Sequence, residues 1–423
     1  MVSYRRRVID TELDELFGGL AAISLDGPKG VGKTLTATQR ANTVLRLDDA
    51  AVAELLRSAP ELLGAREKPI LLDEWQRVPE VWDMVRRRVD EDARGGQYLL
   101  TGSATPVGAT IHSGAGRIVR LRMRPLSIAE RAIATPTVSL AEMLAGDATI
   151  EGTCEVSLET YVREILSSGF PGIRQLSPRQ RRVQLDSYIT HVIEKEFAEQ
   201  GLLVRKPATL RRWMAAYAAA TSSTASYTTI VRAATSAQSE TPAKSTTIAY
   251  RDILTQLWLI DPVPPRVLVH NDFTRLALAE KHYLADPALA ARLLDCDEEK
   301  LLSGARATLL GPQEGTILGR LFEALIALSL QTYAQASESR LSHMRTQRGD
   351  HEIDFIVHRS DGTNVAFEVK LARAISDSDV RHLLWLKEKL GDDLRDMAVI
   401  YTGSHAYRRK DGVAVIPAAL LGP

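Results

Sequence analysis

The chain has 423 residues, more than one ordinary domain holds, so we expect two or three domains. Its 53 Lys and Arg residues balance 53 Asp and Glu residues, so the protein has no global positive field and any contact with nucleic acid must come from local basic patches. Two cysteines, Cys154 and Cys296, are too few for a disulfide framework or a cysteine-based zinc site, and no apolar run approaches the length of a membrane span, so we expect a cytoplasmic protein.

The N-terminal part of the sequence alternates between strands and helices. From residue 1 to about 135, short apolar runs alternate with helical segments, which is typical of a parallel α/β sheet. The expected strands are Ala22–Leu25, Val44–Leu47, Ile70–Asp73 and Tyr98–Thr101, and Arg117–Leu121 could add a fifth. The first strand runs directly into a glycine-rich loop.

This loop, Gly27–Thr34, has the sequence Gly-Pro-Lys-Gly-Val-Gly-Lys-Thr and predicts a phosphate-binding site, because it follows a strand and precedes a helix. Its glycines let main-chain amides approach phosphate oxygens, and the following helix points its positive end at the same place. Lys33 brings a charge to the β- and γ-phosphates, and the hydroxyl of Thr34 completes the shell of a magnesium ion. We therefore expect ATP and Mg²⁺ to bind at Gly27, Pro28, Lys29, Gly30, Val31, Gly32, Lys33, Thr34 and Leu35.

Polar residues at the ends of two further strands complete the predicted nucleotide site. Asp73 and Glu74 end an apolar strand, so both carboxylates should emerge at the carboxyl edge of the sheet beside the loop. Asp73 is placed to hold magnesium through water, and Glu74 to polarise the attacking water as a general base. Thr101 and Ser103 end the neighbouring strand and could sense the γ-phosphate or cap the next turn.

A cluster of arginines, Arg117, Arg120, Arg122 and Arg124, follows that strand. One of them could act as an arginine finger, on its own nucleotide or on that of a neighbour, and a solvated basic face is an equal alternative. Arg117 is the preferred catalytic candidate, because Gly114–Gly116 leaves its backbone free to move.

The middle of the chain, from about 150 to 300, reads as mostly helical. Three short helical segments, near 210–217, 227–234 and 253–260, precede the apolar run Val267–Val269, and this order could be a winged helix-turn-helix. The stretch from Ala218 to Thr247, rich in Ala, Ser and Thr, could equally hold ordinary turns and caps.

The last part of the chain predicts a compact α/β domain built around a hairpin. The pair Asp361-Gly362 is a strong turn signal, and strands paired symmetrically about Asp361 put Asp354 opposite Glu368. Glu368 and Lys370 then share one face, because side chains alternate along a strand. Glu323 adds a third carboxylate on an otherwise apolar helix.

These four residues, Glu323, Asp354, Glu368 and Lys370, have the arrangement of a PD-(D/E)XK nuclease site. In such a site carboxylates, here Asp354 and Glu368, hold a magnesium ion that activates water, and the lysine orients that water. A structural salt-bridge network around Lys370 explains the same residues equally well.

The assembled motifs resemble a prokaryotic family of AAA+-type ATPases whose members join a short P-loop domain to a C-terminal domain of restriction-endonuclease-like fold. The matching segments are Gly27–Thr34, Leu71–Gln76, Leu100–Ala104, Gly116–Arg117, Arg124–Glu130, Ser168–Pro171, Glu352–Phe355 and Phe367–Lys370. The resemblance implies an α/β multidomain protein with a P-loop domain over 1–150, a winged-helix-like helical region over 151–305 and a nuclease-like domain over 306–423. The short P-loop domain leaves little room for a separate helical lid, so a stable hexameric ring is not expected, although the middle region could serve as that lid.

Two functions fit this combination of domains. The first is a magnesium-dependent ATP hydrolase coupled to DNA binding or processing through the nuclease-like domain. The alternative is a nucleotide-switched regulator that binds DNA or protein and whose nuclease fold is catalytically silent. A small-molecule kinase is weaker, because Glu74 after Asp73 favours activation of water. The expected partners are ATP or ADP, with DNA and a second copy of the chain left open, and no membrane.

Overall fold

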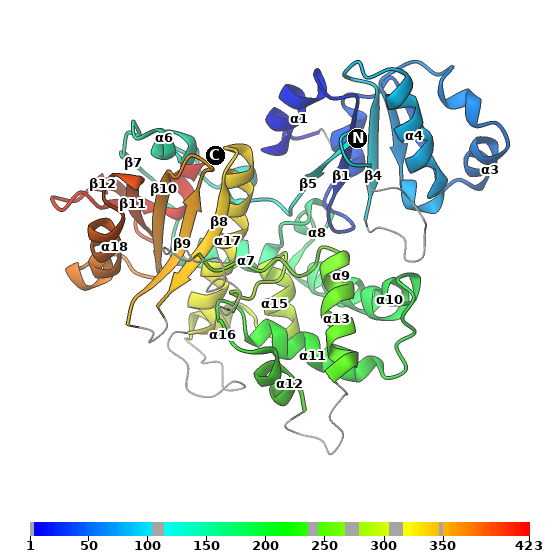
Figure 1. Cartoon of the computed structure of the whole chain (residues 1–423). Helices are drawn as coiled ribbons and strands as arrows, with labels where there is room; N and C mark the ends of the chain where they lie inside the picture. The colour runs from blue at the N-terminus through cyan, green and yellow to red at the C-terminus, as the bar shows by residue number, and fades with distance from the viewer. Residues whose placement is uncertain (1–3, 104–113, 236–243, 267–278, 304–315, 347–349) are drawn as a thin grey trace.

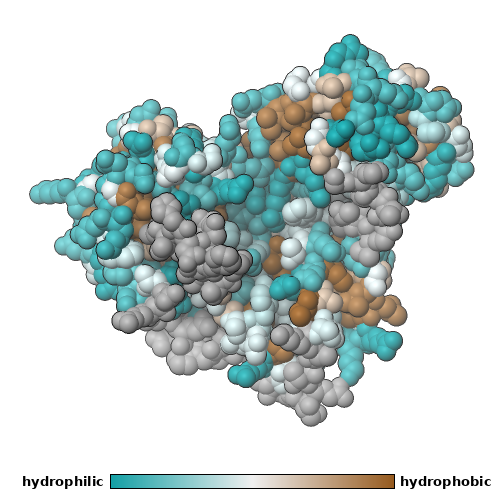
Figure 2. All heavy atoms as spheres, in the orientation of Figure 1, coloured by the Kyte–Doolittle hydropathy of each residue, from teal (hydrophilic) through white to brown (hydrophobic). Residues whose placement is uncertain are grey.

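The computed structural model describes residues 4–103, 114–235, 244–266, 279–303, 316–346 and 350–423. Figure 1 shows an N-terminal lobe in blue and cyan, a C-terminal sheet in orange and red, and helices in green that lie below both. On the face drawn in Figure 2, hydrophilic residues dominate, and hydrophobic ones gather in smaller groups on the N-terminal lobe and on the helical part. Among the described residues, no helix is both long enough and apolar enough to cross a bilayer.

The N-terminal lobe contains a five-stranded sheet in the order β2-β3-β4-β1-β5, and every neighbouring pair is parallel. Its strands are β1 (Ala22–Asp26), β2 (Thr43–Arg46), β3 (Ile70–Asp73), β4 (Tyr98–Gly102) and β5 (Ile118–Arg122). Helices α1 (Ile9–Phe17), α2 (Lys33–Thr38), α3 (Ala50–Ser58) and α4 (Glu80–Glu91) belong to the same lobe. All residues of β1, β3 and β4 are buried, as parallel strands covered on both faces should be. The predicted parallel sheet is confirmed, including its fifth strand.

The middle of the chain is helical. Its main helices are α7 (Leu158–Ser167), α8 (Pro171–Arg174), α9 (Pro178–His191), α10 (Phe197–Glu199), α11 (Pro207–Ala219), α12 (Tyr227–Thr235), α13 (Lys244–Gln256), α15 (Pro287–Leu293) and α16 (Glu298–Leu302). A π-helical turn, η3 (Val192–Glu196), joins α9 to α10. After α13, single bridges pair Ile260 with Leu284 and Val263 with Lys281. The expected strand Val267–Val269 lies outside the described residues, so the winged helix stays a prediction.

The C-terminal part contains a seven-stranded mixed sheet in the order β7-β12-β13-β11-β10-β9-β8. Its strands are β7 (Gly152–Thr153), β8 (Arg340–Arg345), β9 (Glu352–His358), β10 (Asn364–Lys370), β11 (Leu394–Tyr401), β12 (His405–Arg408) and β13 (Ala414–Pro417). Helices α17 (Ile317–Ala336) and α18 (Asp377–Leu390) contribute to two separate apolar clusters. Phe355 and Phe367 of the sheet belong to the same cluster as α17, whereas Ile356 and Ala366 belong to the same cluster as α18. The hairpin has the predicted register, with Phe367 opposite Phe355.

The expected domain boundary at residue 150 does not separate the parts of the structure, because residues before it already pack with the C-terminal part. Strand β6 (Val138–Ser139) pairs with β14 (Leu421–Gly422), and helix α6 (Leu140–Ala145) packs against β10 and β11. Strand β7 then adds to the edge of the sheet beside β12, as Figure 1 shows. The chain therefore contributes β6, α6 and β7 to the C-terminal part first, then forms the middle helices, and then forms the remaining strands of the C-terminal part.

A buried carboxylate, Asp261, joins all three parts. Its two oxygens each lie 2.9 Å from an arginine at the end of β5, Oδ1 from Arg122 Nη1 and Oδ2 from Arg124 Nε. Arg124 also donates to Gln331 and Gln335 on α17, at 2.8 and 2.9 Å. Burial raises the pKa of Asp261, but the charges of the two arginines outweigh burial and lower it overall. The carboxylate is therefore ionised and holds the N-terminal lobe to the other two parts.

Replacement of Asp261 by Asn should destabilise the folded chain. It removes the carboxylate that pairs with both Arg122 and Arg124, two largely buried side chains, and breaking a buried pair costs about 3–5 kcal/mol. The matched control is Asp252→Asn, whose carboxylate is 49% exposed and pairs with its neighbour Arg251. An exposed pair contributes about 0–1 kcal/mol. Denaturant unfolding followed by tryptophan fluorescence should show the larger loss for Asp261→Asn, and equal midpoints would contradict the bridging role.

Candidate functional site

The phosphate loop connects β1 to α2 with a backbone that requires glycine. Gly27 has φ 155°, and a Cβ there would lie 2.2 Å from the carbonyl oxygen of Met123. Gly32 has φ 109° and precedes the first residue of α2. Side chains at these positions would be strained or would clash, so the loop is built for close approach of a ligand to main-chain amides.

Lys33 lies inside this loop. Its ammonium donates to the carbonyl oxygens of Gly27 at 2.7 Å and Pro28 at 2.9 Å, and its side chain is buried. Burial lowers the pKa of Lys33 from 10.5 to about 8, although Glu74, Asp26 and Asp73 act in the opposite direction. The ammonium is therefore charged at neutral pH but easily deprotonated above it.

The residues expected to hold magnesium are in direct contact. Thr34 Oγ1 donates to Asp73 Oδ1 at 2.7 Å, and Thr101 Oγ1 donates to the same oxygen. The parallel register aligns Asp73 with Thr101, so both lie at the carboxyl edge of the sheet. A carboxylate beside a hydroxyl is an oxygen donor set that fits Mg²⁺.

Glu74 is held at the same edge by a residue that the sequence did not single out. It follows β3 with φ 56°, and Gln76 donates from Nε2 to its Oε2 and, at 3.4 Å, to Ser103 Oγ. A Cβ on Gly102 would lie 2.7 Å from Trp75 Nε1, so only glycine lets the turn after β3 cross the end of β4. The one available signal for Gln76 was its place just after the two acidic residues.

The other predicted nucleotide-binding residues divide into buried and exposed positions. Val31 is buried and its carbonyl accepts from Arg7 Nη1 at 3.0 Å, while Arg7 Nε pairs with Glu130 at 2.7 Å. Arg7 therefore supports the loop from behind, which its place in a basic N-terminus did not reveal. Leu35, in contrast, is 62% exposed on α2.

Arg117 cannot act on the phosphate loop of its own chain, so this part of the arginine-finger expectation is wrong. It precedes β5, which runs parallel to β1, and therefore lies at the amino edge of the sheet, opposite the loop. There it pairs with Asp90 of α4 at 2.8 Å. Arg120 instead pairs with Asp26, the last residue of β1 before the loop.

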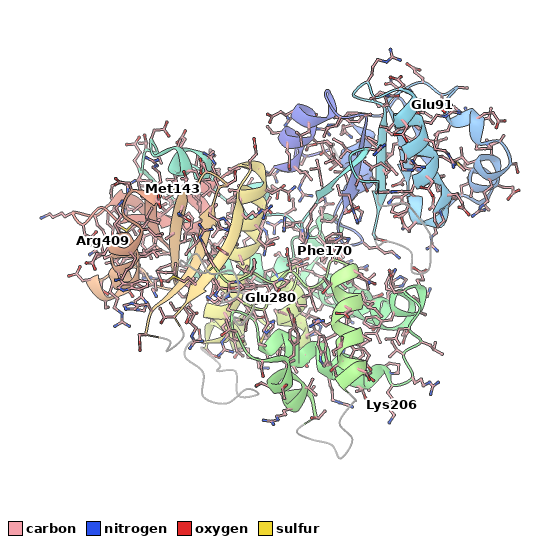
Figure 3. The ribbon with its side chains drawn as sticks, viewed as in Figure 1. Glu91, Met143, Phe170, Lys206, Glu280 and Arg409 are labelled. Atoms are coloured by element: carbon pink, nitrogen blue, oxygen red, sulfur yellow. The ribbon has the colours of Figure 1, made fainter. Side chains whose placement is uncertain are left out.

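The middle helices meet the loop around a cavity of about 330 Å³. Its walls include Lys29, Gly30 and Ser103 from the N-terminal lobe and Tyr188 and Glu196 from the helices. Tyr188 donates to the carbonyl oxygen of Lys29 at 3.2 Å. Figure 3 shows Phe170 at the junction of lobe and helices, and its ring is tilted against that of Tyr188 with the two ring centroids 5.2 Å apart.

A second polar cluster lies where the middle region approaches the C-terminal sheet, near Glu280 in Figure 3. Its centre is Lys281, a buried residue whose ammonium lies 2.9 Å from both Glu323 Oε1 and Asp354 Oδ1. Tyr283 donates to the same oxygen of Glu323 at 2.6 Å. Burial raises the pKa of Glu323 to about 7, whereas Lys281 overcomes the effect of burial on Asp354 and lowers its pKa.

The structure brings the four predicted nuclease residues together, but it also adds Lys281. Lys370 donates to Glu368 Oε2 at 3.1 Å, and the buried Oε1 of Glu368 has no hydrogen-bond partner. Burial and the charge of Asp354 raise the pKa of Glu368. In the described part of the chain no three His, Cys, Asp or Glu residues are arranged to hold a metal ion. Because an ammonium already lies between Asp354 and Glu323, this arrangement does not fit Mg²⁺.

Comparisons with known proteins match three successive stretches of the chain. Residues 21–132 match the AAA domain, and residues 158–300 and 318–421 match two domains of unknown function, DUF8612 and DUF4143. The uncharacterized proteins Rv2008c of Mycobacterium tuberculosis and Mb2031c of Mycobacterium bovis are each 27% identical over 407 residues, which is 94% of this chain and 80% of theirs. The ORC2 protein of Aeropyrum pernix, solved in ADPNP and ADP complexes, aligns over 76% of this chain and 93% of its own, with 13% identity and a TM-score of 0.29, too low to bear on the fold. The chain therefore contains an AAA-type P-loop domain.

The low pKa of Lys33 predicts that nucleotide binding takes up a proton at alkaline pH. A phosphate bound against the ammonium favours its charged form and returns the pKa from about 8 toward 10.5. The affinity for Mg-ADP should therefore fall as the pH rises above 8, because an increasing fraction of the free protein must first be protonated. The terminal phosphate itself, with a pKa of about 6, is already ionised there.

Calorimetric titration at alkaline pH, in buffers of different ionisation enthalpy, measures this proton uptake. The same titration at neutral pH is the control, since Lys33 is already charged there. Affinity and proton uptake that do not change with pH across this range would show that Lys33 does not meet the phosphate.

Proposed function

We propose that this chain is a magnesium-dependent ATP hydrolase. The observation that carries the proposal is the hydrogen bond from Thr34 of the phosphate loop to Asp73, with Glu74 next to it at the same edge. Main-chain amides of Gly27–Gly32 and the ammonium of Lys33 would hold the phosphates, and Thr34 and Asp73 would hold the ion. Magnesium would neutralise charge that develops on the phosphate oxygens.

Glu74 acts as the general base in this proposal. Its carboxylate is oriented by Gln76 and would accept a proton from the water that attacks the γ-phosphate. Gln76 also contacts Ser103, so one amide links the base to the residue expected to sense the γ-phosphate. This arrangement favours transfer to water over transfer to a second substrate.

For the C-terminal domain, we propose the alternative of a catalytically silent nuclease-like fold. Its support is the ammonium of Lys281, which lies 2.9 Å from both Asp354 and Glu323 and satisfies their charge without a metal ion. The chain would then be a regulator that binds DNA or protein and is switched by ATP. The middle region, with its winged-helix-like order of helices, is the proposed contact to that partner.

Substitutions in the phosphate loop and at the base should separate binding from turnover. Lys33→Ala should abolish measurable ATP binding, whereas Glu74→Gln should bind ATP and lower kcat by about 10²–10⁴-fold, the usual contribution of a general base. The matched control is Glu80→Gln at the start of α4, an exposed position nearby. Phosphate release and equilibrium nucleotide binding are the measurements. Wild-type turnover by Glu74→Gln would reject Glu74 as the base.

The C-terminal cluster should neither cleave DNA nor bind a divalent ion in the wild-type chain. Plasmid and linear DNA incubated with Mg²⁺ or Mn²⁺, with and without ATP, should stay intact. Lys281→Met should create one Mn²⁺ site, because it uncovers Glu323 and Asp354, and Lys281→Met combined with Asp354→Asn should lose it again. Paramagnetic resonance of free Mn²⁺ counts these sites.

If the wild type cleaved DNA and Asp354→Ala did not, the C-terminal domain would not be silent and the nuclease hypothesis would stand. The same conclusion would follow if the wild type bound Mn²⁺ at the cluster as tightly as Lys281→Met does.

A further inference from the structure

One ion pair connects the phosphate loop to the middle helices. The ammonium of Lys29, the third residue of the loop, pairs with the carboxylate of Glu196, and Glu199 lies farther away at 3.6 Å. The side chain of Glu196 is only 5% exposed, whereas that of Lys29 is 31% exposed. The pair thus joins a buried carboxylate to an ammonium that can turn toward solvent. Because the carboxylate is buried, leaving it without a partner is costly.

Lys29 borders the same cavity as the edge where hydrolysis is proposed to occur. Both Lys29 and Ser103 line the 330 Å³ cavity, and Ser103 accepts from the Gln76 amide that holds Glu74. The terminal phosphate of ATP bound in the loop would lie at this edge. A long, flexible lysine side chain in the wall of the cavity can therefore turn toward that phosphate.

Glu196 is presented to the loop by the π-helical turn η3. Such turns are rare and occur frequently at functional sites, because the extra residue changes which side chains face a neighbour. Here the turn also brings His191 Nε2 to 3.0 Å from Glu196 Oε1. When Lys29 moves away, Glu196 keeps this second partner, so the carboxylate can release the ammonium without being left alone.

We propose that Lys29 is a cationic finger for the terminal phosphate of ATP, and that Glu196 holds it back until ATP is bound. The inference rests on the proposed ATP hydrolysis and names the residues through which the middle region would control it. The γ-phosphate and the Glu196 carboxylate compete for one ammonium. ADP has no γ-phosphate and leaves the pair intact, so the middle helices respond to ATP and not to ADP.

A double-mutant cycle on the full chain tests this competition. Binding of Mg-ADP and of a non-hydrolysable Mg-ATP analogue, and kcat for ATP, are measured for Lys29→Met, Glu196→Gln and the double variant. Lys29→Met should weaken analogue binding, lower kcat at least about tenfold and leave ADP affinity unchanged. The loss of kcat should be smaller than that caused by removing an arginine finger. Glu196→Gln should strengthen analogue binding by about fivefold or more, and the double variant should behave as Lys29→Met alone.

The control is Glu194→Gln, an exposed residue of the same turn, which should behave as the wild type. Unchanged ADP affinity shows that each variant is folded. Equal losses of ADP and analogue affinity in Lys29→Met, or an effect of Glu196→Gln that persists without Lys29, would overturn the competition. A wild type that binds both nucleotides but releases no phosphate would refute only the proposed hydrolysis, because the binding cycle still decides the role of Lys29.

Discussion

The parallel direction of the five N-terminal strands is the constraint on which the site depends. Because β1, β3 and β4 run the same way, the phosphate loop, Asp73 and Ser103 all emerge at one edge. The hydrogen bond from Thr34 to Asp73 is a direct result of that geometry. The same constraint sends the start of β5 to the opposite edge, which is why Arg117 is far from the loop that follows β1. One register thus decides both which residues meet and which do not.

Local patterns predicted the parts of the molecule that neighbouring residues determine. The strands, the loop and the hairpin register centred on Asp361 follow from apolar runs, glycines and a turn signal, all read within short stretches. Residues that act across long distances gave no such signal. Lys281 meets Glu323 and Asp354 only after the middle region has folded onto the C-terminal sheet, and no periodicity marks it. The boundary at 150 does not separate the parts for the same reason, since β6 and β7 find their partners near the end of the chain.

Buried charge recurs wherever the parts of this chain meet. Asp261 lies between two arginines at and just after the end of β5, Lys281 between carboxylates of the C-terminal part, and Glu196 against Lys29 of the loop. In each place the two signs come from different parts of the chain. Apolar contacts between domains tolerate sliding, whereas a buried ion pair has one good geometry and a high cost when it is separated. Such contacts favour a few discrete arrangements of the domains over a continuous range, as the proposed nucleotide switch requires.

The position of β6 and β7 in the sequence has a consequence for synthesis on the ribosome. These strands and α6 leave the exit tunnel long before β11, β12 and β14, their partners. During that interval the nascent chain carries the apolar side chains of Leu140 and Met143 without the sheet that will bury them. Contacts of such large sequence separation form slowly, and exposed apolar surface invites aggregation until they do. Strand β14 therefore completes a structure begun near residue 138.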